Sequence, residues 1–207
     1  MIPVKVLAVR YLNNCAPALL QALGASGELP SLGILTTDCD DATYIALDEA
    51  TKAAEVEVIY GGSFYAGASN ASTSYAGEVI GILGGRTPGA VRSGMERALE
   101  VLGEIGFSDA KGVPCLAYTV SSAGSFLSKE AGVPEGSALS YLIAPPLESM
   151  YAMDAALKAG DVKLRKLYLP PTATNFGGGL VSGTQSACKI AAEAFLEAVE
   201  EVAGRPI

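Results

Sequence analysis

The strongest constraint on the fold is an internal repeat. Asp48–Val58 reads DEATKAAEVEV and Asp154–Leu164 reads DAALKAGDVKL, so Asp, Ala, Lys, Ala, an acidic residue and Val recur in register. Each segment then reaches a tyrosine, at Tyr60 and Tyr168. Self-similarity over this distance marks a repeated structural unit, so the chain predicts two copies of one domain.

Hydrophobic periodicity predicts the same order of elements in both copies: strand, short helix, strand, helix, strand, strand, helix. In the first copy we expect strands at 4–10, 31–37, 56–60 and 78–83, and helices at 16–23, 42–54 and 88–104. In the second copy, after a short amphipathic stretch that ends at Gly132, we expect strands at 115–121, 139–144, 162–169 and 179–183, and helices at 148–159 and 186–203. Thr87 with Pro88, and Thr184 or Ser186, are typical helix starts. The fold class is α+β, with a four-stranded, mainly antiparallel sheet in each copy and helices on one face. Turn residues near 107–112 place the domain boundary between residues 107 and 108.

Composition excludes several classes of function. The net charge is −8 without any basic cluster, which argues against nucleic-acid and anionic-membrane partners. The chain has no histidine, so it lacks the commonest general base and zinc ligand, and we expect no enzyme and no metal site. Its four cysteines form no CxxC pair. Half of the residues are hydrophobic and only 17% are charged, which indicates surface buried against partners.

Several motifs together resemble a known family. Ser31-Leu32-Gly33-Ile34, the Asp48–Val58 segment, the glycine-rich stretch 77–85 and the alanine-rich stretch 88–103 resemble the domain of bacterial microcompartment (BMC) shell proteins. In each copy an extra strand and short helix precede that block, which is similar to the circularly permuted form of the domain. The segments 40–46 (DDATYIA), 65–68 (YAGA), 144–148 (APPLE) and 183–189 (GTQSACK) are similar to shell proteins of ethanolamine utilization that carry two such domains in tandem.

This resemblance implies two tandem, circularly permuted BMC (ferredoxin-like) domains that form a homotrimer, or pseudohexamer. Such trimers tile with other shell proteins in the shell of a cytoplasmic microcompartment that encloses ethanolamine-degrading enzymes. The resemblance further implies a gated central pore and smaller pores within each subunit. No cofactor is required; the expected ligands are ethanolamine and, at the central pore, cobalamin.

The densest acidic feature, Asp38-Cys39-Asp40-Asp41, predicts a pocket for a small cation. The residues expected to form it are Asp40, Asp41, Tyr65 and Glu78, and the resemblance places the acidic residues of the small pore at Asp40 and Glu78. The alternative is that Asp40 or Asp41 caps a helix. The second copy has Ala144-Pro145-Pro146-Leu147 at this place, so the pocket is expected once per chain.

Two long segments rich in small residues, 61–77 and 170–183, are expected to form mobile gates around the threefold axis. Their candidate gate residues are Phe64, Tyr65, Asn70, Asn175, Phe176, Gly177 and Gly178. The alternative for both segments is an ordinary hairpin connection. Lys52 and Lys158 occupy matching repeat positions and are expected either at the edge between tiles or on solvated helix faces.

Two rival functions remain open. A tandem ferredoxin-like sensor of a small metabolite has the same element order but stays a discrete oligomer, whereas a shell tile forms extended sheets. An enzyme that uses Asp40 and Glu78 as acid and base is the third possibility.

Overall fold

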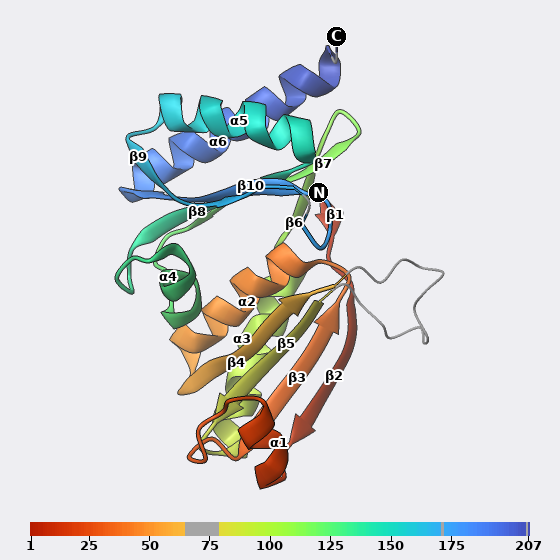
Figure 1. The fold of residues 1–207 in the computed structure, drawn as a ribbon, viewed down its shortest axis with the longest axis vertical. Coiled ribbons are helices and arrows are strands. Elements are labelled where there is room, and N and C mark those ends of the chain that lie inside the picture. Colours follow the sequence, from red (N-terminus) through yellow and green to blue (C-terminus); the bar gives the residue numbers. More distant parts are fainter. Residues whose placement is uncertain (65–78, 171, 206) are drawn as a thin grey trace. The chain divides into compact units, whose positions relative to one another are not determined.

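A computed structural model describes residues 1–64, 79–170, 172–205 and 207 (Figure 1). The chain forms two compact units. The N-terminal unit comprises residues 4–105 and 124–126, and the C-terminal unit comprises residues 1–3, 106–123 and 127–207. The units thus exchange two short segments, which a single division between residues 107 and 108 does not describe.

The N-terminal unit contains a four-stranded antiparallel sheet in the order β2-β3-β5-β4. Its strands are β2 (Val6–Leu12), β3 (Ser31–Thr37), β4 (Val56–Ser63) and β5 (Val79–Gly85). Its helices are α1 (Pro17–Ala22), α2 (Asp40–Ala53) and α3 (Pro88–Glu104). The predicted order and number of elements in this copy are confirmed, and most of the predicted ends lie within two or three residues of the observed ones.

Helices cover both faces of this sheet. A Cβ added at Gly33 would lie 2.8 Å from side-chain atoms of Val91 and Met95 in α3, so glycine lets α3 pack closely on one face. On the other face, Leu32 clusters with Leu20 of α1. We expected the helices on one face only, but β3 is buried along almost its whole length and therefore needs cover on both sides.

The C-terminal unit contains a six-stranded sheet in the order β1-β6-β7-β8-β10-β9. Its strands are β1 (Ile2–Pro3), β6 (Gly106–Ala110), β7 (Val113–Val120), β8 (Ala138–Ala144), β9 (Val162–Tyr168) and β10 (Gly177–Gly183). Its long helices are α5 (Pro146–Ala159) and α6 (Gln185–Gly204), which pack side by side over the sheet (Figure 1). The core between them includes the fully buried Phe195, Leu142 and Val181. The short helix α4 (Ser125–Ala131) begins with two residues of the N-terminal unit.

Strand β6 was not predicted. Residues 106–110 pair with β7 in a tight hairpin, with Ala110 opposite Val113. Lys111 and Gly112 form the turn, with φ angles of 56° and 91°, as a two-residue turn of this hand requires. The predicted boundary region, 107–112, is therefore strand up to Ala110, and only Lys111 and Gly112 form a turn.

Both predicted helix starts are confirmed. The Thr87 hydroxyl accepts a hydrogen bond from the backbone N–H of Ala90 at 3.1 Å, and the Thr184 hydroxyl accepts one from Ala187 at 3.1 Å. The two copies therefore begin their last helix with the same cap.

Candidate functional site

The start of α2 is fixed by a small network of hydroxyl groups. The fully buried Thr37 and Thr43 side chains are hydrogen-bonded to each other at 2.7 Å, and the Thr43 hydroxyl donates to the Cys39 carbonyl at 2.8 Å. The Cys39 N–H donates back to the Thr37 hydroxyl at 3.1 Å. These bonds join the end of β3 to the first turn of α2 and so position the residues between them.

Two carboxylates stand in that first turn. Asp40 and Asp41 are only 8% and 7% exposed, and the Asp41 N–H donates to Asp40 Oδ1 at 2.9 Å. The capping position itself belongs to Cys39, which makes no side-chain cap. The alternative of a helix-end role is therefore confirmed in part: neither carboxylate holds the capping position, but Asp40 accepts the N–H of Asp41, and both stand in the first turn, where the helix dipole favours negative charge. Adjacent carboxylates with little exposure create a concentrated negative potential.

Tyr44 and Ser63 lie next to these carboxylates and were not predicted. Their hydroxyl groups are hydrogen-bonded to each other, which ties α2 to the end of β4. Burial raises the pKa of Tyr44 to about 12, the bond to Ser63 counteracts this, and the charges of Asp40 and Asp41 raise it further. The phenol therefore stays neutral and offers a donor or acceptor beside two anions. One signal in the sequence was available, because Tyr44 follows Asp40 by one helical turn.

Cys39 is not a nucleophile in this arrangement. Burial raises the pKa of its thiol far above the ordinary value, and the nearby Asp41, Asp40 and Asp38 carboxylates raise it further. Because the thiolate is the reactive form, the thiol stays inert at neutral pH.

The structure describes only part of the predicted site. Phe64, 38% exposed, follows Ser63 at the end of β4. Tyr65, Asn70 and Glu78 lie outside the described residues, so their roles remain predictions. The start of the segment 61–77 belongs to β4 up to Ser63 and is strand, not loop.

In the C-terminal unit the predicted gate residues separate into two groups. Asn175 is exposed in a turn with φ at 63°, and the Phe176 ring packs edge-on against Phe107 at 5.8 Å between centroids. Gly177 and Gly178 instead are buried in β10, opposite Ala144 and Ile143 of β8. The predicted segment 170–183 is therefore strand from Gly177 onward, so these two glycines belong to the sheet, and the gate itself stays a prediction.

The comparisons with known proteins decide the family. Residues 31–113 match the model of the BMC domain. The bacterial microcompartment shell protein EutL of Clostridium perfringens is 54% identical over 98% of this chain and 95% of its own length. Its crystal structure superimposes with a TM-score of 0.97, covering 100% of this chain and 96% of that chain. EutL from Leptotrichia buccalis is 54% identical with a TM-score of 0.96, and covers 100% of this chain and 97% of its own. The chain belongs to the EutL family of bacterial microcompartment shell proteins. The resemblance seen in the sequence is confirmed, and so is the fold of the EutL family.

EutL-family membership makes this chain a structural protein of the microcompartment shell. No helix among residues 1–64, 79–170 and 172–205 has the length and apolarity needed to cross a membrane. Those same residues hold no group of three or more Cys, Asp and Glu that could bind a metal ion.

The two candidate edge lysines differ in their surroundings. Lys52 forms an ion pair with Glu49, whose second oxygen lies 3.6 Å from Arg97 of α3. Lys158 pairs with Asp154 at 2.5 Å, and both side chains are mostly exposed. Exposed pairs of this kind contribute little to stability, so Lys158 is free to exchange its partner at an interface.

Proposed function

We propose that this EutL-family protein forms a homotrimer with a gated central pore, and that small acidic pores in each subunit pass ethanolamine through the shell. The observation that supports the substrate is the carboxylate pair Asp40 and Asp41, nearly buried at the start of α2. An ammonium group gains charge attraction and charge-assisted hydrogen bonds from such a pair, which a neutral aldehyde does not. Tyr44 and Ser63 supply hydroxyl groups for the alcohol end of the molecule.

The start of α5 has no counterpart of this carboxylate pair. The residues of α5 that match Asp40 and Asp41 in the repeat are Pro146 and Leu147, which carry no charge. A trimer with sixfold-like symmetry would therefore carry three acidic pores, while the other three related positions are free to serve another purpose.

Ethanolamine binding tests this proposal directly. We expect Asp40→Asn with Asp41→Asn to weaken binding measured by calorimetry at least tenfold, because each charged hydrogen bond contributes about 1.5–3 kcal/mol. Glu193→Gln is the matched control, since it removes one carboxylate from an exposed position on α6. Ethylene glycol, which has the same size without the charge, should bind neither protein. Equal affinity of the doubly substituted protein and the control for ethanolamine would overturn the assignment of the site.

The assembly has its own test. Light scattering of the purified protein should give the mass of three chains, and concentrated samples should form extended sheets in electron micrographs. A monomer at every concentration would overturn the trimer. A discrete oligomer that never forms sheets would favour the metabolite sensor.

For the central pore we propose that Phe64, Tyr65 and Asn70 form the gate together with the turn at Asn175 and Phe176, and that the opening admits cobalamin. Binding of cobalamin, followed by its visible absorbance in equilibrium dialysis, should weaken when Phe176→Asp is introduced; unchanged binding contradicts the role of this turn.

We further propose that the protein performs no covalent chemistry. Purified protein incubated with ethanolamine should release no ammonia, and steady release would contradict this.

A further inference from the structure

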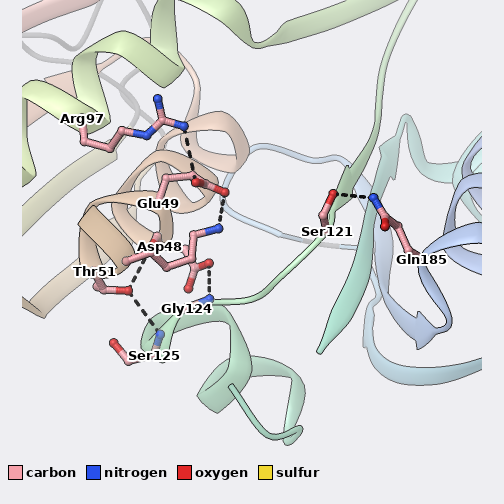
Figure 2. A network of polar contacts seen from close by, with 9 residues as sticks. Asp48, Glu49, Thr51, Arg97, Ser121, Gly124, Ser125 and Gln185 are labelled. Atoms are coloured by element: carbon pink, nitrogen blue, oxygen red, sulfur yellow. Dashed lines mark hydrogen bonds and ion pairs between the residues drawn. The ribbon is translucent and has the colours of Figure 1, made fainter. Parts of the chain in front are cut away.

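A buried contact within the N-terminal unit joins α2 to residues 124–126. The Gly124 N–H donates to Asp48 Oδ2 at 2.7 Å, and the Ser125 N–H donates to Thr51 Oγ1 at 3.2 Å (Figure 2). The ring of Phe126 packs against Tyr44 at 6.0 Å between centroids. The start of the second copy's short helix therefore lies against the side of α2 that carries Tyr44, Asp48 and Thr51.

The repeat identifies the matching residues in the other copies of these elements. Helices α2 and α5 have the same length, and Asp48 of α2 matches Asp154 of α5. The short helices α1 and α4 both end at a glycine with positive φ, Gly24 and Gly132. Counted back from those glycines, residues 16–18 match residues 124–126.

The matching residues on α5 are exposed where those on α2 are buried. Asp48 is fully buried, whereas the Asp154 side chain is 65% exposed. Tyr151 is 48% exposed and matches the fully buried Ile45. Leu147 is likewise exposed, so Leu147, Tyr151 and Asp154 form one surface, here called the α5 patch.

The short helices show the same difference. Leu127 of α4 is buried, whereas the matching Leu19 of α1 is 43% exposed. Ala16 and Ala18 are exposed as well, and with Leu19 they form a second surface, here called the α1 patch. The α1 patch and the α5 patch are therefore the exposed counterparts of residues 124–126 and of α2, which contact each other within the chain.

One pair of positions has changed on both sides. In the N-terminal unit the Ser125 N–H meets the Thr51 hydroxyl, but the matching residues are Pro17, which has no N–H, and Leu157, which has no hydroxyl. Donor and acceptor are thus absent together, and both positions carry apolar residues, although Leu157 also packs against the core of its own unit. This joint replacement is what a contact between position 17 of one copy and position 157 of another would require.

We propose that the α1 patch of one copy of this chain packs on the α5 patch of a second copy, in the way that residues 124–126 pack on α2. Each copy carries one patch of each kind, so the contact runs head to tail, and in the proposed trimer three such contacts close a ring. Ala16 has the Cβ that Gly124 lacks, so α1 sits further from its partner helix, and apolar side chains carry more of this contact than the Asp154 carboxylate does. This inference rests on the proposed trimer and names the surfaces that hold it together.

Disulfide trapping tests which surfaces meet. We expect a protein with both Ala16→Cys and Asp154→Cys to form, on mild oxidation, covalent species of up to three chains on non-reducing gels. Neither single variant should do so. Absence of cross-links in a sample that is trimeric by light scattering would overturn the inference. Cross-links of Asp154→Cys alone would also overturn it, because α5 would then face its own equivalent.

Charge substitution gives a second measurement that separates this inference from the proposed trimer. Leu19→Asp and Tyr151→Asp should each raise the trimer dissociation constant by about a hundredfold, the size expected for a central interface residue. Ile190→Asp, at an equally exposed apolar residue of α6 outside both patches, should leave the dissociation constant unchanged. If the unsubstituted chain is a monomer, the proposed trimer fails. If it is a trimer and both Asp variants keep its affinity, only the inference about the patches fails.

Discussion

Replacement of Gly124 by alanine tests the contact between residues 124–126 and α2 most severely. A Cβ at this position would lie 2.4 Å from Thr51 Oγ1, 2.7 Å from the backbone oxygen of Asp48 and 2.9 Å from Asp48 Oδ1. The backbone oxygen cannot rotate away, so the segment must move off the helix. Movement breaks the 2.7 Å bond to the Asp48 carboxylate and the 3.2 Å bond to Thr51.

The expected cost follows from those two bonds. A hydrogen bond to a charged group contributes about 1.5–3 kcal/mol and a neutral one about 0.5–1.5 kcal/mol, so Gly124→Ala should lower the free energy of unfolding by about 2–4 kcal/mol. The assay is urea unfolding followed by circular dichroism at fixed protein concentration, which holds assembly constant.

Gly103→Ala is the matched control and should have the opposite sign. Gly103 lies within α3, and apart from its chain neighbours and the backbone of its own helix no atom lies within 4 Å of an added Cβ, so alanine should stabilise the protein by about 0.5–1 kcal/mol. Gly124→Ala combined with Thr51→Ala should remain destabilised, because the backbone clash with Asp48 persists. A change below about 0.5 kcal/mol for Gly124→Ala would refute the reasoning, since that is the usual range for surface substitutions.

Three further outcomes are expected. Phe195→Ala should lower the free energy of unfolding by about 3–5 kcal/mol, because it empties a fully buried site, whereas Ile190→Ala on the same helix should change it far less, and equal effects would contradict the assigned core. Thr87→Ala and Thr184→Ala should each cost about 1 kcal/mol in the same assay, and an unchanged midpoint would mean that the cap contributes nothing. Burial raises the pKa of the Cys115 thiol from 9.0 to about 11, so the stability that the neutral thiol contributes is fully present below pH 9 and is lost as the pH rises toward 11. Cys115→Ala should therefore reduce the fall of the urea midpoint between pH 9 and pH 11. An equally steep fall in the variant would contradict this assignment.

Much of the fold was predictable because the sequence contains an internal repeat, so each copy supports the elements predicted for the other. Repeated motifs fixed the order of elements in both copies, and the cap at Thr87 reappears at Thr184. Strand β6 escaped prediction because its residues lack regular alternation and pair only through the short hairpin with β7. The position of α1 also escaped, because a short helix gives little information about which face of a sheet it covers.

The glycines of β10 show why the segment predicted as a mobile loop, 170–183, extends into a strand. Runs of glycine are typical of loops, yet a Cβ at Gly178 would lie 1.9 Å from the backbone oxygen of Leu142, and one at Gly179 would lie 2.2 Å from that of Lys166. These glycines allow neighbouring strands to approach closely, a requirement that becomes visible only when the pairing is known.

At the candidate site the sequence located the charges but not their neighbours. Asp40 and Asp41 were predicted from their clustering, whereas Ser63 reaches Tyr44 only because β4 ends beside α2. In the same way Asp48 was visible as a marker of the repeat, but its bond to Gly124 joins residues distant in sequence. Local pattern identifies such groups, and tertiary structure supplies their partners.

The exchange of short segments between the two units constrains how the protein is made. While only the first hundred residues have left the ribosome, Gly124 is not yet present to donate its hydrogen bond to the Asp48 carboxylate, and β6 is not yet present to pair with Ile2 and Pro3. The N-terminal unit therefore cannot complete its fold until residues 124–126 of the second copy have been synthesised. A gene split at the boundary between the copies would leave each fragment without a piece that the other encodes.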